Sequence, residues 1–283
     1  MHTDTIFFYI YHRHNLLYTG NPSVFKLHTL GEILPFLNKY EVFLRSRGGT
    51  DGGIGVRMRA IRALYNMAIE RKIVRKELYP FDAYKISKLK GKGIKRALNI
   101  DEVQSIINMN ISKCPHLADS RNYFLFSFYT RGMNFADMMK LKCSDTSGDK
   151  IFYIRSKTKG NFIIKILPPV REILDYYSQF SKTKYVFPIL LKDKMTPNQV
   201  ENRTSKTLKK YNKDLKEIAK ICKINKAISS YVARHSFANC LKQKGVATDI
   251  ISESMGHQNV TITQAYLKEL DSSVLDDACE LLL

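Results

Sequence analysis

The sequence predicts a mainly helical protein with a small β-hairpin or sheet (α+β). Apolar residues recur at helical spacing in residues 33–47 and again in residues 54–73. Residues 150–156 and 161–167 are instead rich in β-branched and aromatic residues, and the turn-forming stretch between them ends in Gly160. These runs indicate two helices near the N-terminus and a hairpin in the middle of the chain.

The front of the chain is basic. A glycine-rich stretch, residues 48–53, is expected to break the first helix as a flexible turn. It lacks the Gly-Lys-Ser/Thr ending of a phosphate-binding loop, which argues against a nucleotide site. The second helix carries Arg57, Arg59 and Arg62. These arginines form either a solvated face or a set of contacts to DNA phosphates, and the surrounding excess of positive charge favours DNA.

A lysine-rich segment without acids, residues 85–96, separates two domains. Its glycines and charge are typical of an extended linker along phosphates, to which Lys88, Lys90 and Lys92 would contribute. We therefore predict a helical DNA-binding domain at residues 1–84, a basic linker at 85–97 and a second domain at 98–283.

The composition limits the function classes. The 283 residues carry a net charge of +20 and 44% hydrophobic residues, which predicts a globular protein with a polyanionic partner, most simply double-stranded DNA. The five cysteines are isolated, which argues against a disulfide framework and a zinc site. Residues 6–11 are apolar but too short to span a bilayer, so we expect a cytoplasmic protein. An RNA-binding module is less favoured because no aromatic platform accompanies the lysines.

Several residues of the second domain could form an anion site. Asn99 and Glu102 match a capping box that opens a helix. An apolar helix is expected at residues 122–142, and its Arg131 either pairs with Asp137 or Asp145 or binds an anionic ligand.

Other candidates for this site lie on turns and helix ends. Lys157 lies at the hairpin tip, where a solvated lysine is the simpler interpretation. Arg234 is at the start of a helix, where backbone N–H groups favour anions. His257 follows a helix-ending glycine and precedes Tyr266 by nine residues. Two arginines, a lysine, a histidine and a tyrosine are sufficient to attack a phosphodiester without a metal.

These motifs resemble a known family. ARHSFA, MGHQNVTITQAY and the TKG hairpin are similar to the catalytic domain of the tyrosine recombinases, the phage integrase family, over residues 99–270. RMRAIRALYNMAIERKIV and the following YPF resemble the core-binding domain of that family. The resemblance implies a helical DNA clamp, a basic linker and a catalytic domain with a C-terminal helix. It also implies a site-specific recombinase of the integrase or invertase type that cuts and rejoins DNA through a 3′-phosphotyrosine intermediate.

The resemblance assigns roles to individual residues. It makes Arg234 the second catalytic arginine, His257 the phosphate-contacting histidine, Lys157 the hairpin lysine and Tyr266 the nucleophile. It implies no metal and no cofactor.

The sequence departs from the family pattern at two catalytic positions. Tyr231 replaces the usual histidine three residues before Arg234, and Asn134 stands where the first arginine is expected. Arg131 lies one helical turn earlier and could reach the same phosphate. Residues 1–32 do not clearly match the further helices or arm-binding domain that the family commonly has before residue 33, so we expect a shortened DNA clamp. A catalytically impaired DNA-binding protein on the same scaffold is therefore the alternative, and a type IB topoisomerase shares the chemistry.

The C-terminal residues predict an acidic helix with an apolar stripe. The stripe comprises Val274, Leu275, Ala278, Leu281 and Leu282. The helix either folds back on its own core or, as the family implies, exchanges between protomers. Exchange would give a homo-oligomer on DNA, which we expect to be a tetramer. We expect this assembly to act at the nucleoid, in the cytoplasm.

Overall fold

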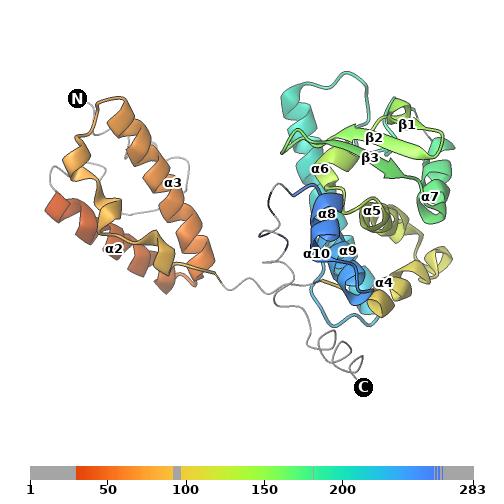
Figure 1. The fold of residues 1–283 in the computed structure, drawn as a ribbon, viewed down its shortest axis with the longest axis horizontal. Coiled ribbons are helices and arrows are strands. Elements are labelled where there is room, and N and C mark those ends of the chain that lie inside the picture. The colour runs from red at the N-terminus through yellow and green to blue at the C-terminus, as the bar shows by residue number, and fades with distance from the viewer. Residues whose placement is uncertain are drawn as a thin grey trace. The chain divides into compact units, whose positions relative to one another are not determined.

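A computed structural model describes residues 30–91, 97–180 and 182–257, together with residues 259, 261 and 263. The chain divides into two compact units, Met1–Ile94 and Lys95–Leu283, and this division falls inside the predicted linker. Figure 1 shows helices in both units and a small sheet in the second, so the predicted fold class is confirmed. Among the described helices, none is both long and apolar enough to cross a membrane.

The front unit is built on two helices, α2 (Leu30–Ser46) and α3 (Asp51–Glu70). Thr50 is the N-cap of α3, and its side chain accepts a hydrogen bond from the backbone N–H of Gly53. The second half of the predicted glycine turn is therefore the first turn of α3. Apolar side chains of both helices form a core that includes Leu37, Ile54, Met58 and Ile61.

Short 3-10 helices at Lys76–Leu78, Pro80–Asp82 and Ile86–Lys88 complete the front unit. Ile86 and Leu89 are buried in the same core as α2 and α3. A Cβ on residue 55 would lie 2.8 Å from the Leu89 carbonyl oxygen, so Gly55 allows this segment to approach α3. The beginning of the predicted linker is thus packed rather than extended, because apolar residues alternate with its lysines.

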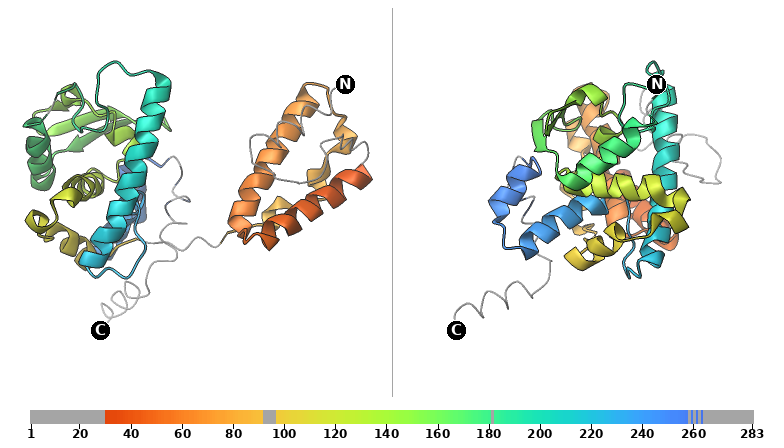
Figure 2. Two further views of the ribbon diagram at one scale, coloured as in Figure 1. Left: turned by 180° about the vertical axis from the view of Figure 1, so that it is seen from behind. Right: turned by 90° about the vertical axis from the view of Figure 1, so that its right-hand side faces the viewer.

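Helix α5 (Ala118–Tyr129) is the central helix of the second unit. It is buried on nearly all sides and contacts α7, α8 and α9. The remaining helices are α4 (Ile100–Ile107), α6 (Phe135–Met138), α7 (Pro168–Ser178), α8 (Pro197–Ile221), α9 (Val232–Gln243) and α10 (Thr248–Ser254). The capping box of α4 is present as predicted, with Glu102 N donating to Asn99 Oδ1 at 2.8 Å. Figure 2 shows α8 running along one side of this unit.

The predicted hairpin is part of a three-stranded antiparallel sheet. Strands β1 (Thr146–Ser147), β2 (Lys150–Ile154) and β3 (Asn161–Lys165) lie in the order β1-β2-β3. Ile151 and Ile164 are paired across the hairpin and both are buried in the core. The sheet lies on one side of α5, whereas α9 and α10 lie on the other (Figures 1 and 2). The sheet and helices α9 and α10, which are distant in sequence, are thereby brought together around α5.

The predicted apolar helix at residues 122–142 is not continuous. Helix α5 ends at Tyr129, and α6 begins only at Phe135. Arg131 and Gly132 between them have φ values of 58° and 72°, which a continuing α-helix does not permit. Contrary to the prediction, Arg131 does not lie one helical turn before Asn134, because the chain turns at Arg131.

Candidate active site

Arg234 is at the centre of the candidate site. It lies in the first turn of α9 and only 2% of its surface is exposed. Its Nη1 donates to the Gly132 carbonyl oxygen at 2.9 Å, and its Nη2 donates to the Met255 carbonyl oxygen at 2.6 Å. Its Nη2 also lies 3.2 Å from His257 Nε2. The guanidinium is thereby held between the turn after α5 and the turn after α10.

A glycine is required beside Arg234. A Cβ built on Gly132 would lie 2.6 Å from Arg234 Cγ and 2.9 Å from Arg234 Cα, and the positive φ of Gly132 also disfavours a side chain. The turn that interrupts the predicted helix therefore allows its carbonyl group to reach the guanidinium.

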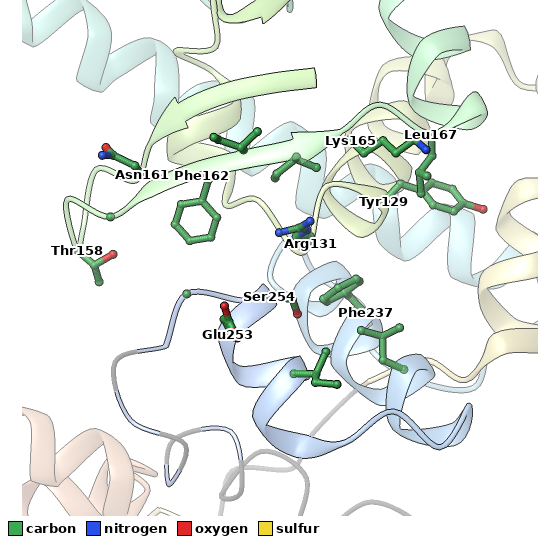
Figure 3. Close-up of a pocket in the computed structure, with 16 residues that line it drawn as sticks. Tyr129, Arg131, Thr158, Asn161, Phe162, Lys165, Leu167, Phe237, Glu253 and Ser254 are labelled. Atoms are coloured by element: carbon green, nitrogen blue, oxygen red, sulfur yellow. The ribbon is translucent and has the colours of Figure 1, made fainter. Parts of the chain in front are cut away.

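His257 lies in the turn that follows α10, as predicted. Gly256 has a φ of 63°, and a Cβ there would be 2.1 Å from the ring of Phe162. Figure 3 shows that this ring points from β3 toward the C-terminal end of α10. The backbone N–H of His257 donates to the Ser252 carbonyl oxygen at 3.0 Å, which closes the turn.

The hydrogen bonds of His257 assign its tautomer. A guanidinium can only donate, so Nε2 accepts from Arg234 and Nδ1 carries the proton. Nδ1 then donates to the hydroxyl of Thr263, 2.7 Å away and fully buried. Burial and the positive charges of Arg234 and Arg155 lower the pKa of His257 to about 4. The free protein therefore holds a neutral imidazole at physiological pH.

Arg131 lies in the turn next to Gly132, whose carbonyl oxygen binds Arg234. It lines a cavity of about 750 Å³ between β3 and helices α9 and α10 (Figure 3). Within the described residues no carboxylate is close enough to pair with it, so the salt bridges to Asp137 or Asp145 are not formed. Asp137 instead accepts a hydrogen bond from the backbone N–H of Ser156 at 2.9 Å.

The positive charge of Arg131 influences Tyr153 on β2. Burial raises the pKa of Tyr153 on β2 to about 12, and Arg234, Arg155 and Arg131 each lower it in part. Three guanidinium groups therefore act on one phenol near the cavity. His257, by contrast, is influenced by Arg234 and Arg155.

The hairpin contributes one exposed and one buried basic residue. Lys157 is exposed in the connection between β2 and β3, as predicted. Arg155, two residues earlier, is only 6% exposed, and its Nη1 lies 3.3 Å from the Met255 carbonyl oxygen. Sequence reasoning missed Arg155, because a basic residue beside a lysine-rich turn normally indicates a solvated side chain.

The two predicted auxiliary residues, Tyr231 and Asn134, and the predicted nucleophile Tyr266 take different positions. Tyr231 is the N-cap of α9, is 46% exposed and packs edge-on against the ring of His235. Asn134 is the N-cap of α6. Tyr266 lies outside the described residues, as does the C-terminal apolar stripe.

The predicted DNA-contacting residues differ in their surroundings. Arg57, Arg59 and Arg62 are exposed on α3, and Lys90 is exposed after the last 3-10 helix of the front unit. Lys88 instead pairs with Glu41 at 3.1 Å and lies over the ring of Tyr84. Lys92 lies outside the described residues. Over the part of the chain that the structure covers, no group of three His, Cys, Asp or Glu residues could hold a metal ion.

Two family models match the chain. The model described as "Phage integrase family" matches residues 96–273, and the "Phage integrase SAM-like domain" matches residues 29–86. A tyrosine recombinase XerD from Halalkalibacterium halodurans is 27% identical over 80% of this chain and 74% of its own length. A tyrosine recombinase XerA from Pyrococcus horikoshii is 29% identical over 62% of this chain and 58% of its own length.

Solved structures share the fold at lower identity. A lambda integrase dimer bound to a COC′ core site has a TM-score of 0.59 at 17% identity, covering 86% of this chain and 82% of that one. The Tn1549 transposon integrase in complex with circular intermediate DNA also has a TM-score of 0.59, at 16% identity, and covers 88% of this chain and 86% of that one. Because the first family model spans more than half of the sequence, the chain belongs to the phage integrase family.

Proposed function

We propose that this protein is a site-specific DNA recombinase of the integrase or invertase type. The observation that carries the proposal is the pairing of Arg234 with His257 in a buried basic site, in a chain that belongs to the phage integrase family. Named tyrosine recombinases among its relatives support the same conclusion.

The proposed reaction is a transesterification without loss of phosphodiester energy. The phenol oxygen of Tyr266 attacks the phosphorus, the bond to the 5′ oxygen breaks, and a 3′-phosphotyrosine link remains. The phenol proton passes to a base, and Lys157 protonates the departing 5′ oxygen. A 5′-hydroxyl of another strand then reverses these steps and releases the tyrosine.

The basic residues act on the charge of the transition state. Arg234 is proposed to hold one nonbridging oxygen of the scissile phosphate, where negative charge develops, and His257 the other, with Nε2 taking up a proton and turning from Arg234 to the phosphate when DNA binds. Arg131 is proposed to supply a second guanidinium from the cavity beside β3. Tyr231 and Asn134 occupy positions where the family has a histidine and an arginine, and we propose auxiliary hydrogen-bonding roles for them.

The front unit is proposed to hold the duplex. Its exposed arginines on α3 and the lysines that follow it would contact phosphates and so add salt-dependent affinity. We further propose that the protein assembles as a tetramer on DNA through its C-terminal helix. A lambda integrase tetramer bound to a Holliday junction is among the solved structures with a similar fold. A protein acting in this way would work at the nucleoid, in the cytoplasm.

A covalent trap separates the recombinase from a protein that only binds DNA. Nicked fragments of the DNA flanking the gene would be incubated with the protein, because release of a short strand prevents religation. We expect a denaturation-resistant protein–DNA adduct that is absent for Tyr266→Phe. Binding without any adduct would support the binding-only alternative, and relaxation of supercoils without sequence demand would indicate a topoisomerase.

A further inference from the structure

Arg155 is a buried cation whose role the proposed reaction leaves open. The backbone N–H of Arg155 donates to the Gly160 carbonyl oxygen at 2.9 Å, and its carbonyl oxygen accepts from the N–H of Lys159 at 2.9 Å. The hairpin turn therefore fixes its backbone. Its side chain points into the protein, and 6% of the residue is exposed.

The side chain of Arg155 contacts a turn 100 residues away. Its Nη1 lies 3.3 Å from the Met255 carbonyl oxygen and 3.4 Å from the Gly256 carbonyl oxygen. Both distances exceed those of ordinary N–H···O bonds, as expected for one nitrogen shared by two acceptors. These carbonyl groups belong to the end of α10, where the helix dipole is negative.

Two arginines converge on the same carbonyl group. Met255 O accepts from Arg234 Nη2 at 2.6 Å in addition to its contact with Arg155. On the β3 side, the ring of Phe162 fills the space beside Gly256. The peptide that precedes His257 is thereby held by Arg155 from the hairpin and Arg234 from α9.

The charge of Arg155 is not needed for these contacts. Backbone carbonyl groups would be satisfied by a neutral donor, and burying an unpaired guanidinium is costly. Within the described residues no carboxylate pairs with Arg155, and its buried Nε has no acceptor there. A fixed charge in this place is useful if an anion binds nearby, and it already acts on His257.

We infer that Arg155 is a positioning residue for strand transfer: it clamps the Met255–Gly256 turn so that His257 and Arg234 stay aligned on the scissile phosphate, and it adds positive charge behind them. This inference rests on the proposed recombinase function. It adds a third arginine, from the hairpin, to the two assigned from sequence.

The test compares Arg155→Gln and Arg155→Lys with a matched control. Arg121→Gln is the control, because Arg121 also donates to backbone carbonyl oxygens, those of Ile106 and Ile107, from a partly buried position. Misalignment of a catalytic group by about 1 Å can cost about 10²-fold in rate. We expect Arg155→Gln to slow adduct formation on the nicked substrate by about 10- to 100-fold, Arg155→Lys by less, and Arg121→Gln hardly at all, with DNA binding retained.

A second readout is the titration of His257. In protein labelled with ¹³C-histidine, the His257 signal is identified by its absence in His257→Gln. We expect it to titrate at higher pH in Arg155→Gln than in the wild type, and unchanged in Arg121→Gln.

Wild-type adduct rates in the folded Arg155 variants would overturn the inference. If Arg155→Gln does not fold, Arg155→Lys decides alone, since it keeps the charge but not the planar fork that spans two carbonyl groups. A wild-type chain that forms no adduct counts against the recombinase function instead. In that case an unshifted His257 titration in the folded variant would still refute the clamp.

Discussion

Gly132 and Arg234 are in direct contact, although they are 102 residues apart. The carbonyl oxygen of Gly132 accepts from Arg234 Nη1 at 2.9 Å, and a Cβ on residue 132 would lie 2.6 Å from Arg234 Cγ. The left-handed turn after α5 therefore packs directly against Arg234 and requires a glycine at residue 132. Any side chain at residue 132 would have to displace the guanidinium or the turn.

Gly132→Ala is expected to reduce strand cleavage through Arg234. The added methyl group displaces Arg234, so adduct formation on a nicked substrate should fall by about 10²-fold. The left-handed backbone adds a stability cost of about 1 kcal/mol or more. Single-turnover adduct rates and thermal unfolding would both be measured.

Gly148→Ala is the matched control for this substitution. Gly148 also has a positive φ, 59°, but a Cβ there would meet nothing within 4 Å. Gly148→Ala shares the cost of the left-handed backbone but not the clash, so it should lose less stability than Gly132→Ala and keep its cleavage rate. If the two variants cleave equally well, the contact between Gly132 and Arg234 does not matter for the reaction.

Arg234→Ala should separate chemistry from binding. Loss of one transition-state donor typically costs about 10²- to 10³-fold in rate, so we expect cleavage to fall by at least about 10²-fold. DNA affinity, measured by fluorescence anisotropy, should stay near that of the wild type, because the front unit still binds the duplex. Equal losses of cleavage and affinity would make Arg234 a binding residue.

Much of the site could be predicted because its residues stand in local motifs. Arg234 begins a helix and Gly256-His257 ends one, and both features follow from capping and positive-φ preferences that can be read within a few residues. The hairpin is equally local. These parts of the prediction agree with the structure.

Arg155 and the break at Arg131 could not be predicted in the same way. Arg155 is buried against a turn 100 residues away, where it contacts the Met255 carbonyl oxygen. Nothing in the neighbouring sequence therefore distinguishes it from a solvated basic residue. Residues 122–142 are predominantly apolar, and this hid the turn at Thr130–Asn134, which depends on the space required by Arg234. Tertiary contacts determined both outcomes.

The titration of His257 predicts a pH dependence of stability. Its pKa is lowered from 6.5 to about 4 in the folded protein. Between these values the unfolded chain binds more protons than the folded chain, so the free energy of unfolding falls as the pH drops from 6.5 toward 4. His257→Gln lacks this contribution and can still bond to Arg234 and Thr263.

Thermal unfolding at pH 7.5 and pH 5 would test this. The wild type should lose more thermal stability than His257→Gln over the same interval, because other titrating groups contribute equally to both. Parallel changes in the two proteins would mean that His257 is not held neutral in the fold.

Removal of residues 274–283 tests the proposed exchange of C-terminal helices. These residues carry an apolar stripe on an acidic segment. If the helix binds a neighbouring protomer, the truncated protein should bind a single site normally but assemble poorly on DNA with two sites, as seen on native gels. Unchanged assembly would reject the exchange and favour a helix that folds on its own core.

The basic residues of the front unit should differ in their contribution to DNA affinity. Removing a side chain that neutralises one DNA phosphate is expected to reduce the slope of log K against log salt by about 1. Arg62 is exposed on α3 without an ion pair in the described part of the chain, so Arg62→Ala should show this reduction.

Lys88 is the informative comparison. Its Nζ lies 3.1 Å from Glu41, which also binds Arg45 and Tyr84. Burial raises the pKa of Glu41, but these hydrogen bonds and the charge of Lys88 outweigh it and hold the pKa at about 2. Because Lys88 is committed to this carboxylate, Lys88→Ala should lower the stability of the front unit and barely change the salt slope. If Lys88→Ala instead reduces the slope by a full unit, DNA draws Lys88 away from Glu41.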